Sequence, residues 1–439
     1  MSGVELGLAS FAALLLLLAI RVPIAVAMIT CGTVGFIAVA GWTPLLGYLK
    51  NAAFSKYASY DLSVIPLFLA MGAFAGKAGV SQALFRCAAA FLGHRRGGMA
   101  MGTIGACAGF GAICGSSLAT AATMCQVALP EMRRYGYHDR LSTGVLAAGG
   151  TLGILIPPSI VLAVYGILTE QNIGTLFIAA IIPGLIATVG YMLAIAIYVR
   201  LHPTHGPAAP PVPWAERWRT VIDVWPVLLI FAVVIGGIYG GVFTPTEAAA
   251  VGAVATAGLG IARRRLSLAD LQECLLSTAE TTAMIFLILL GADLFNAFLA
   301  FTRLPSLAAE WIVGTGISPL MVVVVILILY FVLGCLMDSL SMILLTIPVF
   351  FPTIMALDFG MPRDDVAIWF GIIVLMTVEV GLITPPVGLN VYVINGMAKS
   401  VPMAETFRGV LPFLASDAVR IVLLTAFPIL TLGLVYWLD

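Results

Sequence analysis

Long apolar stretches follow one another along almost the whole chain, and only short polar connections separate them. Such stretches predict membrane-spanning helices, because the strands of a transmembrane barrel would give short segments of alternating polarity. Of the 439 residues, 61% are hydrophobic and only 10% are charged, which is not the balance of a soluble domain. The first stretch, Leu6–Ile20, has no Lys or Arg before it and is expected to remain a span rather than be cleaved as a signal. The sequence therefore predicts an all-α polytopic membrane protein.

Charge and side-chain chemistry disfavour several other classes of protein. The formal net charge is +0, so no nucleic-acid partner is expected. The 7 cysteines show no CxxC spacing and are expected to pack in the interior rather than bind metal. All 4 histidines lie in polar connections, which leaves no base beside Ser116 or Ser117 for an intramembrane hydrolase. The phosphate-binding pattern GxxxxGK[ST] does not occur, so the chain is not expected to hydrolyse ATP. We expect no enzyme activity and no organic cofactor.

An internal repeat divides the chain into two halves. The sequence GILIPPSI at 153–160 is echoed by GLITPPVG at 381–388. Other positions match at one common, slightly shorter spacing, namely Pro23 with Pro245, Ser117 with Ser339, and Pro130 with Pro352. A Pro-rich polar stretch at 201–222 lies between the halves and is expected to be an exposed linker on the cytoplasmic side. We therefore predict a first repeat over 1–200 and a second over 223–439.

Each repeat is interpreted as three spans, a re-entrant hairpin, a span broken by the proline pair, and a final span. Proline cannot donate a backbone hydrogen bond, so a proline pair unwinds a helix. The hairpins are predicted at about 105–130 and 319–357, and the broken helices at about 142–170 and 366–396. Because each half would cross the membrane an odd number of times, the second repeat is expected to be inverted relative to the first.

The basic residues predict which side of the membrane each connection faces. With the N-terminus outside, 17 of the 21 Lys and Arg residues fall on the cytoplasmic side. The four left outside are Lys50, Lys56, Arg303 and Arg363. This count includes Arg420, and no arginine is expected within a span. We therefore predict that both termini are periplasmic, that the first hairpin enters from the cytoplasm, and that the second enters from outside.

The hairpin tips and the proline breaks are the candidate polar sites. One tip falls at Gly115–Ser117, and the other, within Cys335–Ser341, contains the ionisable residue Asp338. Exposed amides, carbonyls and hydroxyls suit a carboxylate or a hard cation such as Na⁺. Close helix packing and plain proline kinks are the structural alternatives. Two copies of a break, each paired with a polar tip, favour the functional interpretation.

Three further acidic residues have local interpretations. Glu247 follows Thr244 and Pro245 in the pattern of a capping box at a helix N-terminus. Asp293 has Asn296 one turn away as a hydrogen-bonding partner. Glu379, two residues before the second break, either tunes that break or pairs with a neighbour.

Several ordered motifs resemble the large membrane subunit of the tripartite ATP-independent periplasmic (TRAP) transporters. They are GAICGSSLATAATM, GGVFTPTEAAAVGAVA and VEVGLITPPVGLNVYVINGMA, and the resemblance extends over about 65–398. It implies an elevator-type transporter in the bacterial inner membrane that uses a Na⁺ gradient to import a small organic acid. It also implies two partners, a small four-helix membrane subunit on a separate chain and a periplasmic substrate-binding protein.

The resemblance also implies two Na⁺ sites, each between a hairpin tip and a break. The residues carried over to the first are Ser116, Ser117, Gly153, Ile156 and Pro157. Those carried over to the second are Asp338, Ser339, Ser341, Gly381, Thr384, Pro385 and Gly388. The substrate is expected to contact Ser116, Ser117, Thr120, Pro158, Ser159 and Asn390. A self-sufficient sodium–anion symporter of related architecture, and a passive channel or scaffold subunit, remain as alternatives.

Overall fold

The computed structural model describes residues 3–20 and 22–438, so Arg21 lies outside the described residues. Within them the chain forms helices and no strand. Five helices are long and apolar enough to cross a membrane, or up to seven if each of two bent helix pairs counts as one span. The prediction of an all-α polytopic membrane protein is confirmed.

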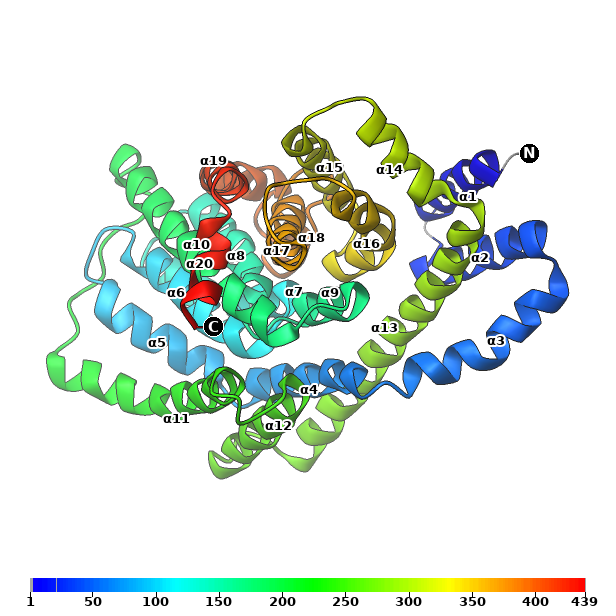
Figure 1. Cartoon of the computed structure of the whole chain (residues 1–439). Coiled ribbons are helices and arrows are strands. Elements are labelled where there is room, and N and C mark those ends of the chain that lie inside the picture. The colour runs from blue at the N-terminus through cyan, green and yellow to red at the C-terminus, as the bar shows by residue number, and fades with distance from the viewer. Residues whose placement is uncertain (1–2, 21, 439) are drawn as a thin grey trace.

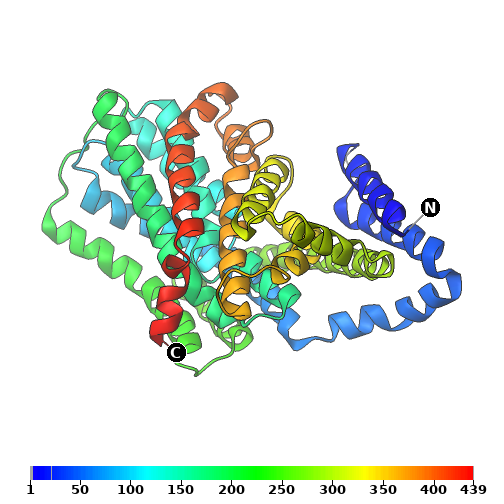
Figure 2. The ribbon, with the colours of Figure 1, turned by 45° about the horizontal axis from the view of Figure 1, so that its top comes forward.

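Nine helices, which we call the outer helices, form an arc around the others (Figure 1). The first repeat supplies α1 (Gly3–Ala19), α2 (Ile24–Ala40), α3 (Trp42–Tyr57), α4 (Val64–Lys77) and α5 (Val80–Leu92), with a 3₁₀ turn η1 (Tyr60–Ser63) before α4. The second repeat supplies α11 (Trp214–Tyr239), α12 (Pro245–Ala262), α13 (Leu268–Thr302) and α14 (Leu304–Gly314). The long helix α13 packs along α2 and α4, and Figure 2 shows α1–α3 reaching away from the other helices of the first repeat.

The remaining helices, which we call the central helices, pack inside this arc. From the first repeat they are α6 (Gly98–Cys114), α7 (Ser117–Arg134), α8 (Asp139–Leu155), α9 (Ile160–Thr169) and α10 (Ile173–Leu201). From the second they are α15 (Pro319–Gly334), α16 (Ser339–Met355), α17 (Arg363–Gly381), α18 (Leu389–Met397), α19 (Met403–Ala426) and α20 (Ile429–Leu438). The order of elements from α6 to α10 is therefore the order from α15 to α19.

The hairpins and breaks occupy the expected parts of the chain. The first hairpin, α6 and α7, is longer than the expected range 105–130, because α6 already begins beyond the left-handed residue Gly97 (φ 73°). Helices α6, α15 and α16 have 17, 16 and 17 residues, fewer than the roughly 20 that a helix needs to cross a bilayer. That α6–α7 and α15–α16 form re-entrant hairpins stays a prediction.

The outer helices bend sharply at two left-handed residues. The axes of the η1–α4 segment and α5 differ by 62°, and the connection passes through Gly79 in the left-handed region (φ 74°). In the second repeat α13 ends and α14 starts around Arg303, which is also left-handed (φ 56°). A polar connection alone does not reveal such bends in the sequence.

The connection between the repeats is shorter and more tightly held than expected. Helix α11 already begins at Trp214, so only 202–213 is non-helical, rather than 201–222. The Gly97 amide donates to the Gly206 carbonyl at 2.9 Å, and the Ala209 amide donates to the Gly93 carbonyl at 2.9 Å. These bonds dock the connection against the start of α6, so it is not a free linker.

Candidate functional site

The first hairpin tip is a tight turn that rests on the first proline break. Gly115 makes the turn in the left-handed region (φ 63°), and Ser116 caps α7 by accepting from the Ala119 amide at 3.4 Å. A Cβ added to Gly115 would lie 3.1 Å from the Pro158 carbonyl oxygen. Ser117 is buried directly after the cap. The tip therefore brings backbone and hydroxyl oxygens against the unwound segment between α8 and α9.

Close approach between α6, α7 and α8 depends on glycine. A Cβ on Gly111 would lie 2.6 Å from the Gly153 Cα atom. A Cβ on Gly153 would lie 2.4 Å from the Thr120 hydroxyl oxygen and 2.6 Å from the Ser116 carbonyl oxygen. Pro157 lacks an amide hydrogen, so it cannot donate to the Gly153 carbonyl as a helix would require. Oxygen atoms from the tip and from the break thus gather at Gly153.

Two polar side chains next to this point lack hydrogen-bond partners among the described residues. They are the Thr120 hydroxyl and the Asn390 side-chain oxygen, and both residues are 0% exposed. Asn390 belongs to α18 of the second repeat, yet its amide group donates to the Ala147 carbonyl of α8 at 3.2 Å. Its amide nitrogen lies 3.0 Å from the position of a Cβ added to Gly150, one turn from Gly153 on α8. A buried polar atom left unpaired is costly, which marks this position as a ligand site candidate.

The second hairpin meets the second break through an equivalent glycine contact. A Cβ on Gly381, at the end of α17, would lie 2.5 Å from the Gly334 Cα atom at the end of α15. Asp338 caps α16 by accepting from the Ser341 amide at 3.0 Å, and both Ser339 and Ser341 are buried. The structural alternative for Asp338, a helix cap, is therefore present, and its second carboxylate oxygen does not take part in that bond.

The second break differs from the first in how its carbonyls are used. The amides of Thr384 and Asn390 donate to the carbonyls of Gly381 and Leu382, each at 3.0 Å, and the Thr384 hydroxyl donates to the Val380 carbonyl. Each carbonyl retains a second lone pair for a further ligand. Pro385 is exposed whereas Pro157 and Pro158 are buried, so the first break is closed by packing and the second is open.

The other predicted site residues have structural roles at the edges of the two breaks. Ser159 caps α9 by accepting from the Leu162 amide at 3.3 Å. Gly388 precedes α18 in the left-handed region (φ 59°), which favours glycine. The side chains of Ile156 and Pro157 line an apolar cavity of about 270 Å³ shared with α10 and α11. For these two residues only the backbone carbonyl offers a ligand oxygen.

The donor set fits a hard monovalent cation better than a transition metal. In the part of the chain that the structure describes, no three His, Cys, Asp or Glu side chains are grouped to hold a metal ion. The oxygens at both tips come from hydroxyls, carbonyls and one carboxylate, which are the ligands of hard cations.

Comparison with known proteins assigns the family. Residues 11–430 match the sequence model of a family described as "Tripartite ATP-independent periplasmic transporter, DctM component". The chain belongs to this family. As a TRAP large permease subunit it is a transporter component and not an enzyme. The match is wider than the range 65–398 over which the motifs themselves are recognisable.

The relatives of this permease are named for several different substrates. It is 39% identical to a C4-dicarboxylate TRAP transporter large permease from Pseudomonas aeruginosa over 87% of both chains. It is 31% identical to a sialic acid TRAP large permease from Vibrio cholerae, over 85% of this chain and 86% of that one. The solved YdaH transporter from Alcanivorax borkumensis shares the fold, with a TM-score of 0.62 at 16% identity over 87% of this chain and 88% of that one.

A buried charged cluster in the permease corrects the expectation that no arginine lies within a span. Arg420 lies inside α19 with its side chain only 2% exposed, and its guanidinium is 2.8 Å from Asp417. Arg420 therefore does not belong to a cytoplasmic connection, and the charge count becomes 16 of 20 rather than 17 of 21. Glu379 is 0% exposed on α17, which packs against α19. The signal in the sequence was the spacing of Asp417 and Arg420, one helical turn apart in an otherwise apolar run.

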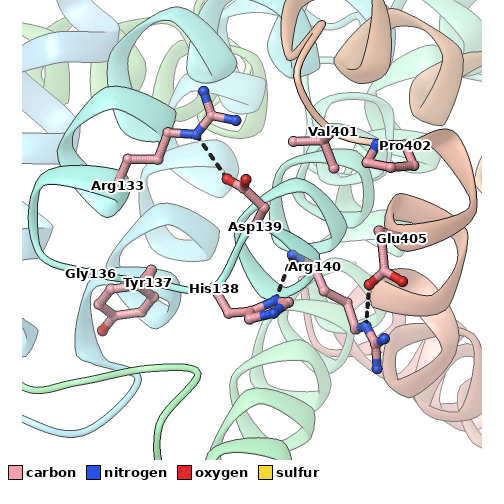
Figure 3. Close-up of a pocket in the computed structure, with 9 residues that line it drawn as sticks. All are labelled: Arg133, Gly136, Tyr137, His138, Asp139, Arg140, Val401, Pro402 and Glu405. Carbon is pink, nitrogen blue, oxygen red and sulfur yellow. Dashed lines mark hydrogen bonds and ion pairs between the residues drawn. The ribbon is translucent and has the colours of Figure 1, made fainter.

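A hollow of about 750 Å³ lies where α7 and α8 meet the start of α19 (Figure 3). Arg133 pairs with Asp139 and Arg140 pairs with Glu405, in each case at 2.8 Å. The Arg140–Glu405 pair joins the two repeats. Since each arginine already faces a carboxylate, this hollow has no free positive charge to attract a substrate anion, and the organic acid is not assigned to it.

Three of the histidines come together beside this hollow, which the sequence did not predict. The rings of His138 and His205 stack at 4.2 Å, and those of His202 and His205 lie 5.1 Å apart. Tyr198 is 2.8 Å from His205 Nδ1. Burial, and then the neighbouring His138 and His202, lower the pKa of His205. The cluster fixes the connection between the repeats in a form that favours neutral His205.

The remaining acidic residues are explained by local bonding. The capping box of Thr244 and Glu247 at the start of α12 is confirmed, with Pro245 in the first turn. The Tyr48 hydroxyl donates to the Asp293 carboxylate, which joins α3 to α13. Both residues thus stabilise the outer helices.

Proposed function

We propose that this permease imports a small organic acid together with Na⁺, receiving the acid from a periplasmic binding protein. The relatives support an organic acid, since the names at 39% and 31% identity include C4-dicarboxylates and sialic acid. An isethionate relative, of which this chain matches 62%, is named as a permease protein DctMQ. In the proposal, the small four-helix membrane subunit is a separate chain in the same membrane.

The observation that carries the proposal is the repeated contact between a hairpin tip and a broken helix. Gly153 meets the first tip and Gly381 meets the second hairpin at distances that leave no room for a side chain. Ion ligands in such a site come from carbonyls of unwound helices and from hydroxyls at the tips. In the proposal, the buried side-chain oxygens of Thr120 on α7 and Asn390 on α18, which have no hydrogen-bond partner among the described residues, contact the substrate or an ion.

The proposed movement is that of an elevator. Both tips and both breaks belong to the central helices, which pack on one another across the two repeats. The outer helices would stay fixed in the bilayer as a frame while the central helices carry the bound acid and Na⁺ across. The proposed orientation, with both termini periplasmic, rests on the remaining 16 of 20 basic residues expected on the cytoplasmic side.

Uptake into vesicles tests this function. The permease is reconstituted with the small subunit and binding protein of its own organism, and uptake of radiolabelled succinate is measured with an inward Na⁺ gradient or with K⁺ alone. We expect uptake only with Na⁺, and a strong loss in Thr120→Ala. Thr256→Ala is the matched control, since Thr256 is equally buried but donates to the Gly252 carbonyl within α12.

Other results would replace or correct the proposal. Na⁺-driven uptake that needs no binding protein would identify a self-sufficient symporter. Flux that follows the succinate gradient alone, without regard to Na⁺, would indicate a channel. Equal uptake by Thr120→Ala and Thr256→Ala would remove Thr120 from the binding site.

A further inference from the structure

One face of α7 is exposed from the first hairpin tip to the last turns of the helix. Ala119, Gln126 and Pro130 are exposed on this face, and Thr123 is half-buried between them. Steps of three or four residues place all of them in one line along the helix. We call these four residues the α7 stripe. At a rise of about 1.5 Å per residue, the α7 stripe runs for roughly 16 Å away from the tip.

The α7 stripe does not have the side chains of a lipid-facing surface. A lipid-facing stripe is made of large apolar side chains. On α10 such a stripe is formed by Leu185, Val189, Leu193, Ile197 and Leu201, each more than half exposed. Among the described residues of α7, no exposed side chain is a large apolar one. Polar side chains in membrane segments face the protein interior or a water-filled cavity, so the exposed Gln126 indicates water beside α7.

The α7 stripe ends in a hollow of about 580 Å³ at the end of α7 away from the tip. Gln126, Pro130 and Arg134 line this hollow from α7, and Gln82 and Arg86 line it from α5. Helix α5 packs against both α6 and α7. One water molecule takes up about 30 Å³, so the hollow has room for a small organic acid and several waters.

Arg86 brings an unpaired positive charge to this hollow. Among the described residues its guanidinium has no ion pair and no hydrogen bond, whereas Arg134 lies 3.7 Å from Glu131. Glu216 of α11 also lines the hollow, but it is not ion-paired with Arg86. An anion is therefore attracted from the α5 side and repelled from the α11 side. This differs from the hollow of Figure 3, where each arginine already faces a carboxylate.

We propose that the hollow beside Arg86 is an exit site for the organic acid, in which Arg86 receives a carboxylate group that has left the first hairpin tip. The inference rests on the proposed function, because it requires an acid bound near that tip. A guanidinium suits a carboxylate because it offers paired N–H donors. The side-chain amides of Gln82 and Gln126 offer further donors to the same group.

The two walls of the exit site belong to different sets of helices. Arg86 lies on α5, one of the outer helices, whereas the α7 stripe belongs to the central helices. The elevator movement proposed above would therefore bring the α7 stripe to Arg86 in one position and remove it in another. In the proposed orientation the first hairpin enters from the cytoplasm, so this exit leads to the cytoplasm. An unpaired charge at an open site acts mainly on rates of arrival and departure, which suits release rather than storage.

The first test asks whether water reaches the α7 stripe in the membrane. Ala119→Cys on the α7 stripe is compared with Val189→Cys on the lipid-facing stripe of α10. The permease is reconstituted with its small subunit, and a negatively charged, membrane-impermeant thiosulfonate is supplied on both faces of the vesicles. The native cysteines are buried apart from the half-buried Cys87, and the wild type gives their background. We expect rapid labelling of Ala119→Cys alone, and equal labelling of the two variants would overturn the water-filled route.

The second test asks whether the hollow binds a carboxylate through Arg86. Pro130→Cys serves as a reporter in the hollow, and its labelling by an uncharged maleimide is measured as succinate is added. We expect succinate to slow labelling and the neutral analogue succinamide to have no effect. Adding Arg86→Gln should raise the half-protecting succinate concentration about three- to ten-fold. This difference should shrink at high ionic strength, because the site is open to water.

Matched variants separate the exit site from general effects of charge. Arg95 lies in the connection between α5 and α6, where it is exposed, does not line the hollow, and has no side-chain partner among the described residues. Arg95→Gln should therefore leave the half-protecting concentration unchanged. Glu216→Gln should lower it, since that change removes the repelling charge. Arg86→Lys keeps the positive charge and should restore part of the protection.

Each outcome decides between the exit site and its alternatives. Equal half-protecting concentrations with Arg86→Gln and Arg95→Gln would overturn the role of Arg86. Equal protection by succinate and succinamide would overturn carboxylate recognition in the hollow. In both cases Na⁺-driven uptake by the wild type would leave the proposed function standing. Absence of Na⁺-driven succinate uptake by the wild type would refute the proposed function, and the exit site with it.

Discussion

The contact between Gly153 and the first hairpin tip makes Gly153→Ala the most informative single substitution in the first site. The added Cβ would lie 2.4 Å from the Thr120 hydroxyl oxygen and 2.6 Å from the Ser116 carbonyl oxygen. Ordinary contacts between heavy atoms lie near ~3.5 Å, so one side must retreat by about 1 Å. Because Ser116 contributes backbone rather than a flexible side chain, we expect the tip to move away from the break.

The magnitude follows from the cost of overpacking. Inserting a methyl group into a closely packed interior costs about 1–3 kcal/mol. Alanine regains up to about 1 kcal/mol of helix propensity relative to glycine, so the net loss of stability in KCl should be small. If the overpacking cost applies only when the tip closes around an ion, the Na⁺ concentration at half-saturation should rise roughly 5- to 150-fold.

The assay is the Na⁺ titration of thermal unfolding, with Gly258→Ala as the matched control. Gly258 lies inside α12 with no atom within 4 Å of an added Cβ, so its substitution should leave the Na⁺ response unchanged. A Gly153→Ala protein with the same half-saturating Na⁺ concentration as Gly258→Ala would refute the assignment of an ion site to this contact.

Three further predictions concern stability and pH. Lowering the pH below about 6.5 should release the connection between the repeats, because the pKa of His205 is lowered and its neutral form stabilises the docked state. Faster amide exchange over 205–209 would show this release, and His205→Asn should abolish its pH dependence. Thr244→Ala should cost about 1 kcal/mol through loss of the α12 cap, measured as a lower unfolding temperature, with the Na⁺ response unchanged. Arg420→Met should destabilise by about 3–5 kcal/mol by leaving Asp417 buried and unpaired, and adding Asp417→Leu should restore part of the unfolding temperature.

Features with a local cause were predictable from the sequence. A proline pair stops a helix wherever it occurs, so the breaks at Pro157 and Pro385 lie inside the predicted ranges. The turn at Gly115 and the cap by Ser116 are likewise set by adjacent residues. The capping box at Thr244 depends on a spacing of three residues, and the structure contains it.

Features that depend on distant partners were not predictable in this way. Gly111 and Gly334 look like ordinary small residues in apolar runs. Only the packing shows that each allows a broken helix to approach closely. Arg420 was placed outside the membrane because only the packing around α19 shows that its side chain is buried. The docking of the connection between the repeats depends on His138, which is far from it in the chain.

The central claim is that ions bind where the hairpin tips meet the proline breaks. It is tested most directly by the thermal stability of the purified permease as NaCl replaces KCl at fixed ionic strength. Binding to the folded state should stabilise by about 1.4 kcal/mol when free Na⁺ is roughly ten times the Kd. We predict a saturable rise specific to Na⁺ that is smaller in both Ser117→Ala and Thr384→Ala. Identical unfolding in the two salts would contradict the claim and leave the proline breaks as plain kinks.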